Sequence, residues 1–183
     1  MILGAVGFMF GTGGSALIAI TIGAGDRRRA NRLFSLFVYV SAICGILIAV
    51  FGFLFIRPIA SMLGAEGTLL DQCVSYGRIL LPALPALILE YEFLSYFSTA
   101  EKPQLGLAFT IAAGVTNMVL DALFVAVFHW GLTGAAAATA LSQAVGGIAP
   151  LFYFCCPNTS ILRLTKTKFD GKALLKACTN GSS

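Results

Sequence analysis

Five long apolar runs divide the chain, and each is about as long as a membrane is thick. They cover Ile2–Gly23, Phe34–Ile56, Ile79–Ala100, Leu105–Phe128 and Leu132–Cys156. A helix needs about 20 residues to cross a bilayer core of ~30 Å, and backbone groups inside lipid must be hydrogen-bonded within their own segment. The runs therefore predict an all-α integral membrane protein with five transmembrane helices. Charged residues make up 11% of the chain, whereas soluble domains carry about 25%.

The arginines and lysines gather at one end of these predicted helices. Ten of the twelve fall in three patches, Arg27–Arg32, Lys102 and Arg163–Lys176. If the five runs alternate in direction, all three patches lie on the same side, and the positive-inside rule makes that side cytoplasmic. We therefore expect a multi-pass protein of the plasma membrane, with the basic segments 25–33 and 157–180 in the cytoplasm.

The end of the chain differs in character from the apolar part. From Ile161 to Ala177, apolar residues are mixed with lysines, which is typical of an amphipathic helix on a membrane surface. The sequence thus predicts a membrane unit over residues 1–156 and a basic cytoplasmic linker or tail over residues 157–183.

Glycines and prolines predict how the helices meet, end and bend. Four glycines of the first run share one helical face: Gly4, Gly7, Gly11 and Gly14. Small residues on one face allow a neighbouring helix to approach closely. Pro58 is expected to end the second helix, with a short interfacial helix in the outer connection 58–75. Pro82 and Pro85, one turn apart, are expected to kink the third helix.

A polar stripe runs along one face of the fourth run. Its members are Thr110, Gly114, Asn117 and Asp121, spaced by four, three and four residues. This spacing follows one face of a helix. Asn117 and Asp121 lie one turn apart and can bind one ligand together. An acid inside a membrane is costly and generally functional, so Asp121 is the leading candidate for a binding residue.

The fifth run carries a matching stripe of small and polar residues: Ala135, Thr139, Ser142 and Gly146. Asp121 and Thr139 each lie nine residues from Trp130 in the intervening turn. At ~1.5 Å per residue, both should lie roughly 13 Å below that turn. We therefore expect Asn117, Asp121 and Thr139 to form an oxygen-lined site at one depth. The alternative is a hydrogen-bond clamp between the two helices that holds no ligand.

The candidate site has the chemistry of a proton or sodium site. Carboxylate, amide and hydroxyl oxygens suit Na⁺ or H⁺, and nothing in the sequence favours a transition metal. We expect the coupling ion, H⁺ or Na⁺, to bind at Asp121, Asn117 and Thr139, with no other metal and no cofactor. No set of catalytic residues is evident, so the chain is not expected to be an enzyme.

Two further acids lie within the third run. Glu90 and Glu92 are two residues apart, so they point to different faces of a helix and do not form a carboxylate pair. Each costs roughly 2.5–3.5 kcal/mol at the middle of a membrane helix. For Glu90, a place in a water-filled cavity and a structural hydrogen bond are both open, whereas the structural role is favoured for Glu92. Ser142 is a second candidate for lining the cavity.

Several motifs of this sequence resemble those of the multidrug and toxic compound extrusion (MATE) transporters. The motifs are Gly23-Ala-Gly-Asp26 with Arg29-Ala-Asn31, Ala100-Glu-Lys-Pro103, Asn117-Met-Val-Leu-Asp121 and Gly131-Leu-Thr-Gly-Ala-Ala-Ala-Ala-Thr139-Ala-Leu-Ser142. The resemblance runs from about Gly4 to Phe154. Its specific part is the last two motifs at their mutual separation.

The resemblance implies a fold, an activity and a set of site residues. MATE transporters have two lobes of six helices around a central cavity, and they export cationic or aromatic compounds, driven by proton or sodium entry. The five runs correspond to the second to sixth helices of an incomplete amino-terminal lobe. In that family an Asn and an Asp of the fifth helix, a Thr of the sixth and an Asp of the first bind the cation. Asn117, Asp121 and Thr139 match three of these four residues, and the fourth has no counterpart here.

The resemblance favours a fragment of a cation-coupled multidrug efflux antiporter, whose activity needs a first helix and a second lobe. Its partners would be membrane lipid and small organic cationic or aromatic substrates, not nucleic acid. Two alternatives are a truncated membrane protein that transports nothing and a lipid-linked oligosaccharide flippase of the same superfamily. A flippase would hold pyrophosphate with cationic residues in its cavity. The five predicted helix interiors carry no Lys or Arg, which argues against a flippase.

Overall fold

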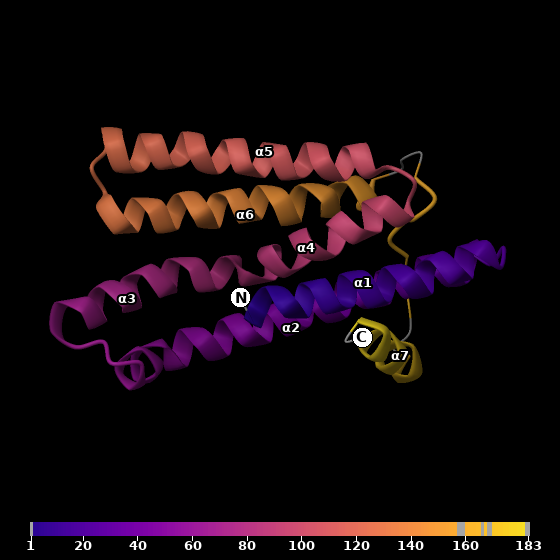
Figure 1. Cartoon of the computed structure of the whole chain (residues 1–183), viewed down its shortest axis with the longest axis horizontal. Coiled ribbons are helices and arrows are strands. Elements are labelled where there is room, and N and C mark those ends of the chain that lie inside the picture. The colour runs from indigo at the N-terminus through magenta and orange to yellow at the C-terminus, as the bar shows by residue number, and fades with distance from the viewer. Residues whose placement is uncertain (1, 157–159, 166, 168–169, 182–183) are drawn as a thin grey trace.

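The computed structural model describes residues 2–156, 160–165, 167 and 170–181, and in this part of the chain every regular element is helical (Figure 1). The α-helices are α1 (Ile2–Gly23), α2 (Arg27–Met62), α3 (Gly67–Leu80), α4 (Leu84–Thr99), α5 (Pro103–Asp121), α6 (Gly131–Cys155) and α7 (Gly171–Gly181). A 3₁₀ turn, η1 (Leu81–Ala83), joins α3 to α4, and a π-helical segment, η2 (Ala122–Val127), follows α5.

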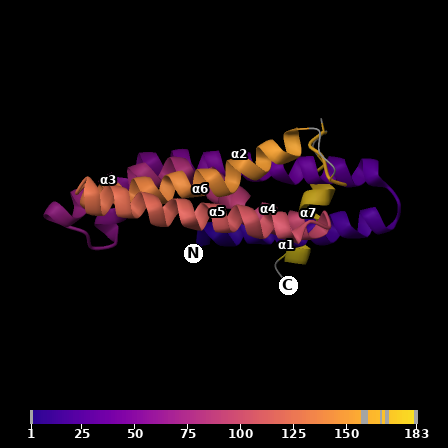
Figure 2. The same cartoon turned by 90° about the horizontal axis from the view of Figure 1, so that it is seen from above.

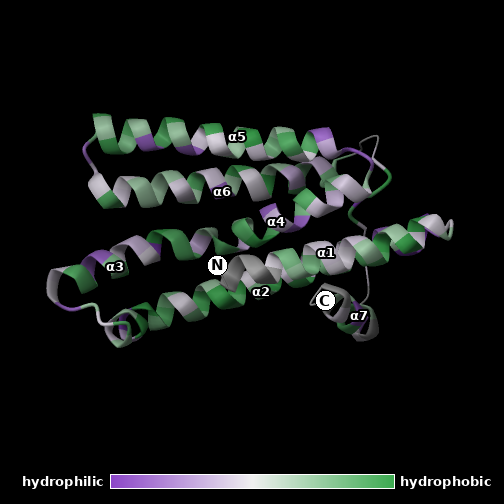
Figure 3. Cartoon of the chain, in the orientation of Figure 1, coloured by the Kyte–Doolittle hydropathy of each residue, from purple (hydrophilic) through white to green (hydrophobic). Residues whose placement is uncertain are grey.

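Four helical units of the described chain are long and apolar enough to cross a membrane. They are Arg27–Met62, Gly67–Thr99, Pro103–Val127 and Gly131–Cys155, and α1 adds a shorter apolar helix over Gly7–Gly23. Each of the five predicted runs overlaps one of these helices, and apolar residues extend along all of them in Figure 3. The prediction of an all-α membrane protein is confirmed.

The second helix is longer at both ends than its apolar run. At its start, the Asp26 carboxylate accepts a hydrogen bond from the backbone N–H of Arg29 at 3.0 Å, which caps a first turn of arginines. At its end, the helix continues through Pro58, and the N–H of Leu63 still donates to the carbonyl of Ile59. The expected stop at Pro58 is therefore wrong. The connection 58–75 does contain the start of a separate helix, α3, but this helix begins at Gly67 and continues toward the third span. One proline removes a single backbone donor, and the hydrogen bonds that follow it persist.

The third run bends where its prolines predicted. Pro82 lies within η1, and Pro85 lies in the first turn of α4, where the missing N–H of a proline has no helical partner to lose. The helical unit begins at Gly67, twelve residues before the predicted start at Ile79. The added residues belong to α3, which is mostly exposed.

Small residues bring α1 close to α4. A methyl group added at Gly7 would lie 2.6 Å from the backbone oxygen of Ile88, and one added at Gly11 would lie 3.2 Å from the Cα of Glu92. The two backbones are therefore too close for larger side chains at these positions. The predicted close approach at this glycine face is confirmed for Gly7 and Gly11.

An aromatic cluster joins three helices at the end of the bundle where α4 turns into α5. Phe34 of α2, Phe97 of α4 and Phe154 of α6 are all fully buried. The ring centroids of Phe34 and Phe154 are 5.0 Å apart, and those of Phe97 and Phe154 are 4.9 Å apart. Aromatic pairs at these separations add stability beyond that which comes from their buried area. The cluster therefore stabilises the packing of α2, α4 and α6 at this end of the bundle.

The last helix, α7, packs against α1 (Figures 1 and 2). The sequence predicts an amphipathic helix over 161–177, but α7 begins only at Gly171. Before it, Leu162 is fully buried and the N–H of Thr165 donates to Ser35 Oγ at 2.7 Å. These contacts tie the segment to α2 and compete with helix formation. Of the predicted tail over 157–183, residues 157–159, 166, 168–169 and 182–183 lie outside the described residues.

Candidate functional site

The segments α5, η2 and α6 form an antiparallel hairpin, which runs along the top of the molecule in Figure 1. Near its turn, the rings of Phe124 and Trp130 stack with centroids 5.1 Å apart. A methyl group added at Gly134 would lie 3.0 Å from the Cβ of Phe124, so the two helices touch here. Gly134 thus allows the start of α6 to pack directly against η2.

Asn117 and Thr139 meet across this hairpin. The Asn117 amide donates a hydrogen bond to Thr139 Oγ1 at 3.5 Å, and the Thr139 hydroxyl donates to the carbonyl of Ala135 at 2.9 Å. The side chains of Asn117 and Thr139 are both partly buried. The structure therefore brings two of the three predicted site residues together. The Asn117 amide also carries a carbonyl oxygen, which can accept a hydrogen bond or bind a cation.

Asp121 is the last residue of α5, one turn beyond Asn117. Its Oδ1 atom is buried and has no hydrogen-bond partner among the described residues. Buried polar atoms in native proteins are nearly always hydrogen-bonded, so an orphaned carboxylate oxygen is typical of a group that takes up a further ligand. The π-helical segment η2 begins at the next residue, and π-helical turns frequently occur at functional sites.

Asp121 and Thr139 do not lie at the equal depth that the sequence predicts. Phe124 lies against Gly134, and Asn117 lies against Thr139. Thr139 is therefore level with Asn117, and Asp121 lies one turn nearer to the end of the hairpin. The predicted depth assumed α-helix throughout, whereas η2 has the wider i→i+5 turns of a π-helix and advances less per residue. Asn117, and not Asp121, therefore lies opposite Thr139.

A sequence model of the MatE family matches residues 1–123. This chain belongs to the MatE family. Multidrug export protein MepA of Staphylococcus haemolyticus is 29% identical over 175 residues, which cover 96% of this chain and 39% of the relative. MepA of Staphylococcus saprophyticus is 27% identical over 153 residues, which cover 84% of this chain and 34% of the relative.

Solved structures of MATE transporters share the fold of this MatE-family chain. The inward-facing conformation of a multidrug resistance MATE family transporter matches with a TM-score of 0.90 at 22% identity, over 98% of this chain and 41% of that chain. An outward-facing conformation matches with a TM-score of 0.87 at 22% identity, over 96% and 40%. The chain thus spans about two fifths of the length of these proteins, and the resemblance drawn from its motifs is confirmed.

Ser142 lies within the hairpin of this MatE-family chain, on α6, and Glu90 of α4 lies beside it. Ser142 is buried, and its hydroxyl donates to the carbonyl of Thr139 at 2.8 Å. Glu90 is partly buried in a small pocket between α4, α5 and α6, with Thr110 and Gly146 in its lining. A methyl group added at Gly146 would lie 2.5 Å from the Glu90 Cδ. Glu90 therefore points toward α6, in a pocket whose lining does not include the three candidate ion ligands.

Glu92 points in a different direction, to the place where α1, α2 and α4 meet. It is fully buried, and the Tyr96 hydroxyl donates to its Oε1 at 2.7 Å. The structural hydrogen bond expected of Glu92 is therefore present. Its second carboxylate oxygen, Oε2, has no hydrogen-bond partner in the described chain, which a purely structural role does not explain.

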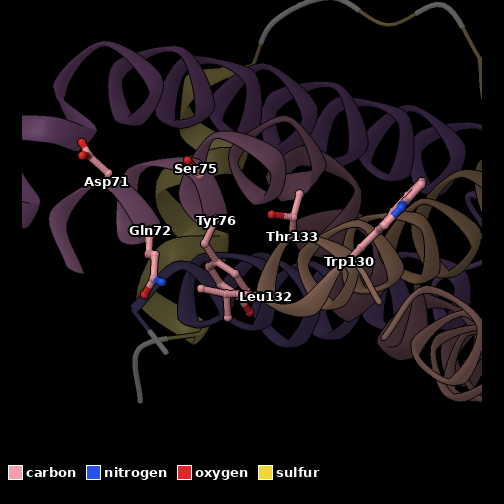
Figure 4. Close-up of a pocket in the computed structure, with 7 residues that line it drawn as sticks. All are labelled: Asp71, Gln72, Ser75, Tyr76, Trp130, Leu132 and Thr133. Atoms are coloured by element: carbon pink, nitrogen blue, oxygen red, sulfur yellow. The ribbon is translucent and has the colours of Figure 1, made fainter. Parts of the chain in front are cut away.

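A further pocket of the chain lies at the end of the bundle near the hairpin turn, and sequence reasoning missed it. Residues of α3 face residues at the start of α6 across it (Figure 4), namely Asp71, Gln72, Ser75, Tyr76, Trp130, Leu132 and Thr133. The Asp71 carboxylate also lies 3.7 Å from the Arg57 guanidinium, and both side chains are exposed. The aromatic and polar residue types were visible in the sequence. Their meeting was not, because α3 and α6 are far apart along the chain.

Proposed function

We propose that the chain is part of a cation-coupled multidrug efflux antiporter, in which entry of H⁺ or Na⁺ drives export of small organic cations or aromatic compounds. The curated relatives are named for multidrug export, and one solved neighbour is a multidrug resistance MATE family transporter. The observation that carries the proposal is the orphaned Oδ1 of Asp121, one turn from the Asn117–Thr139 pair. A clamp without a ligand accounts for the pair but not for the unpaired acid.

The three side chains supply what either coupling ion needs. For Na⁺, the Asp121 carboxylate supplies the negative charge, and the Asn117 amide and the Thr139 hydroxyl supply neutral oxygens, which hard cations prefer. For H⁺, the same carboxylate takes up the proton and gains an O–H donor in place of an unpaired charge. Either ion removes the cost of a charged acid inside the membrane.

Ion binding drives transport in this proposal by selecting one arrangement of α5 and α6. A ligand shifts a conformational equilibrium only by the difference between its affinities for the two states. Because the ligands come from both helices, a change in their relative position changes the affinity for the ion. The TM-scores of 0.90 and 0.87 to inward-facing and outward-facing structures fit a lobe that keeps its fold in both states.

We further propose that the protein lies in the plasma membrane and works together with transporter segments that this chain does not supply. The basic segments 25–33 and 157–180 face the cytoplasm, where anionic lipid of the plasma membrane attracts them. The matched part of the chain covers 39% of the MepA relative. We infer that transport also needs a first helix and a second lobe, which is consistent with this partial coverage.

The test is Asp121→Asn in the complete transporter, reconstituted in liposomes that contain a fluorescent organic cation. The substitution keeps the shape of the side chain and removes its charge. We expect ion-driven efflux to fall by roughly tenfold, since a loss of ~1.4 kcal/mol in differential ion affinity changes the ratio of the two states tenfold. Glu66→Gln is the matched control, because Glu66 is exposed and its side chain caps no backbone group. It should leave efflux unchanged.

A proton gradient and a sodium gradient are applied in separate experiments, and the gradient that drives efflux identifies the coupling ion. Unchanged efflux with unchanged ion dependence in Asp121→Asn would remove Asp121 from the mechanism. Translocation of a lipid-linked oligosaccharide, without efflux of organic cations, would favour the flippase.

A further inference from the structure

Glu92 occupies a second buried polar site, on the side of α4 that faces α1 and α2. Its side chain has 0% exposure, and so do Tyr96 and Ser41 beside it. The Tyr96 hydroxyl donates to Glu92 Oε1 at 2.7 Å and lies 3.4 Å from the carbonyl oxygen of Phe10 in α1. Three helices therefore contribute polar atoms to a site from which solvent is excluded.

Two polar atoms of this site lack partners, and they belong to facing helices. Glu92 Oε2 and Ser41 Oγ are both buried without a hydrogen bond in the described chain. Ser41 of α2 is nevertheless close to the Glu92 carboxyl group, so its hydroxyl can form a hydrogen bond with Oε2. Native proteins rarely leave buried polar atoms unsatisfied, and this bond satisfies both oxygens. The Ser41 hydroxyl can donate to an ionised Glu92 or accept from a neutral one, so burial and the surrounding charges decide which form Glu92 takes.

The helix register keeps Glu92 and Ser41 level. A methyl group added at Gly45 of α2 would lie 3.4 Å from the Ile88 side chain of α4. Ser41 lies one turn before Gly45, and Glu92 lies one turn after Ile88 on the antiparallel neighbour, so the two meet at the next level. On the opposite side, Gly11 of α1 packs against the Glu92 backbone. Backbone packing on both sides therefore sets the position of Glu92.

The surroundings offer no charge to balance an ionised Glu92. Among the described groups, Tyr96 faces it from α4 and the Ser41 hydroxyl from α2, and the Phe10 carbonyl of α1 lies beside the Tyr96 hydroxyl. Glu90, the other acid of α4, points to Gly146 on a different face, and the arginines of α2 are exposed at its two ends. A buried charge without a partner is strongly unfavourable, so the neutral acid is the form that fits this site.

A proton fits the site, and a metal ion does not. A methyl group added at Gly14 of α1 would lie 2.7 Å from the Tyr96 hydroxyl, and one added at Gly11 would lie 3.1 Å from Ser95 Oγ. The α1 side is therefore too closely packed to take a cation with its own ligand shell. A proton needs no volume, and on Oε2 it makes Glu92 a donor to Ser41 Oγ while Oε1 keeps its bond from Tyr96.

We propose that Glu92 is a second proton-binding site, which holds its proton while α1, α2 and α4 are packed together. One proton from water adds to Oε2, and no other bond is made or broken. Loss of the proton leaves an unpaired charge at the three-helix contact, and this favours arrangements in which α1 separates from α4 and admits water. The site does not depend on Asp121, so it goes beyond the proposed coupling site.

Infrared difference spectroscopy of the chain in lipid bilayers tests the protonation state directly. At neutral pH we expect the wild-type spectrum to contain the carbonyl stretch of a protonated acid that is lost in Glu92→Gln and retained in Glu90→Gln. Tyr96→Phe should move the band to higher frequency, because Tyr96 donates to the carbonyl oxygen of that acid. Identical wild-type and Glu92→Gln spectra in this region overturn the proposal. If Glu92→Gln does not fold, a band that Tyr96→Phe leaves in place overturns it instead.

Thermal unfolding at several pH values provides a second readout. A folded state with protonated Glu92 binds one more proton than the unfolded chain at neutral pH, so its stability falls as the pH rises. Glu92→Gln stays neutral and can donate to Ser41, so its melting temperature should lack this decline with rising pH, which Glu90→Gln should keep. An equal decline in wild type and Glu92→Gln contradicts the proposal. Neither measurement involves transport, so failure here leaves the Asp121 proposal unaffected.

Discussion

Thr139 shows how much can depend on one oxygen atom. Its hydroxyl accepts a hydrogen bond from Asn117 of α5 and donates to Ala135 of its own helix. Removing the hydroxyl leaves the Asn117 amide without this acceptor in a partly buried setting, where an unsatisfied polar group is costly. The same loss removes one of the three oxygens that we assign to the coupling ion.

Thr139→Val is therefore expected to weaken ion dependence without unfolding the hairpin. The loss of one hydrogen-bonding oxygen corresponds to ~1 kcal/mol, or about fivefold in apparent ion affinity. The measurement is the ion concentration that gives half-maximal efflux in the complete transporter. Thr139→Ser keeps the hydroxyl and should stay close to wild type. Equal behaviour of the two variants would show that the methyl group matters and the oxygen does not.

Among the helices, α1 and α4 pack with their backbones especially close together. Gly7 lets the two backbones approach so closely that an added methyl group would lie 2.6 Å from a main-chain oxygen of α4, and one at Gly11 would lie 3.2 Å from a Cα atom. Main-chain atoms cannot move aside as the end of a flexible side chain can. This contact also closes the Glu92 site from the α1 side, so helix packing and the buried acid are coupled.

Gly7→Ala is expected to destabilise the helix bundle. Its Cβ would lie 2.6 Å from the backbone oxygen of Ile88, and such overpacking typically costs about 1–3 kcal/mol. The matched control is Gly23→Ala at the end of the same helix, where no atom lies within 4 Å of the added methyl group. Gly23→Ala should change stability by less than about 0.5 kcal/mol. Melting temperatures in detergent compare the two, and equal values would contradict the close contact.

Across the whole molecule, much apolar surface is left uncovered. The α5–η2 span is the least covered of the four long spans, because only 6% of its most apolar 18-residue stretch is buried. Leu107, Ile111 and Met118 of this span are all exposed. Lipid covers such surface in a membrane protein, whereas a soluble monomer rarely exposes a patch of this size. The apolar exterior therefore agrees with a chain that spans the membrane several times.

The cysteines allow the proposed orientation in the membrane to be measured. Cys73 of α3 and Cys155 of α6 are both exposed, and the alternating helices place them on opposite sides. In intact cells, a membrane-impermeant thiol reagent should label a variant that keeps only Cys73. It should label a variant that keeps only Cys155 only after the cells have been permeabilised. The reverse pattern would overturn the assignment of segments 25–33 and 157–180 to the cytoplasm.

Local patterns in the sequence were sufficient to locate the long helices and to single out the candidate residues. Hydropathy over about 20 residues marks a membrane span wherever it occurs, and helical periodicity places Asn117 and Asp121 on one face before any partner is known. Helix ends were less accurate: α2 passes through Pro58, and α7 begins at Gly171. Proline and amphipathic patterns express preferences. Persisting helical hydrogen bonds outweighed the preference at Pro58, and the contacts of Leu162 and Thr165 outweighed it before Gly171.

Length, hydropathy and period are properties of each segment alone, so they were enough to predict a chain that crosses a membrane as helices and carries acids inside them. Which residues meet depends on the tertiary structure. Thr139 stands opposite Asn117, the Oδ1 atom of Asp121 is left unpaired, and Glu92 is enclosed by α1 and α2. These outcomes depend on how each helix is rotated and shifted against its neighbours, and that is set by close packing at residues such as Gly11 and Gly134, far apart in the chain.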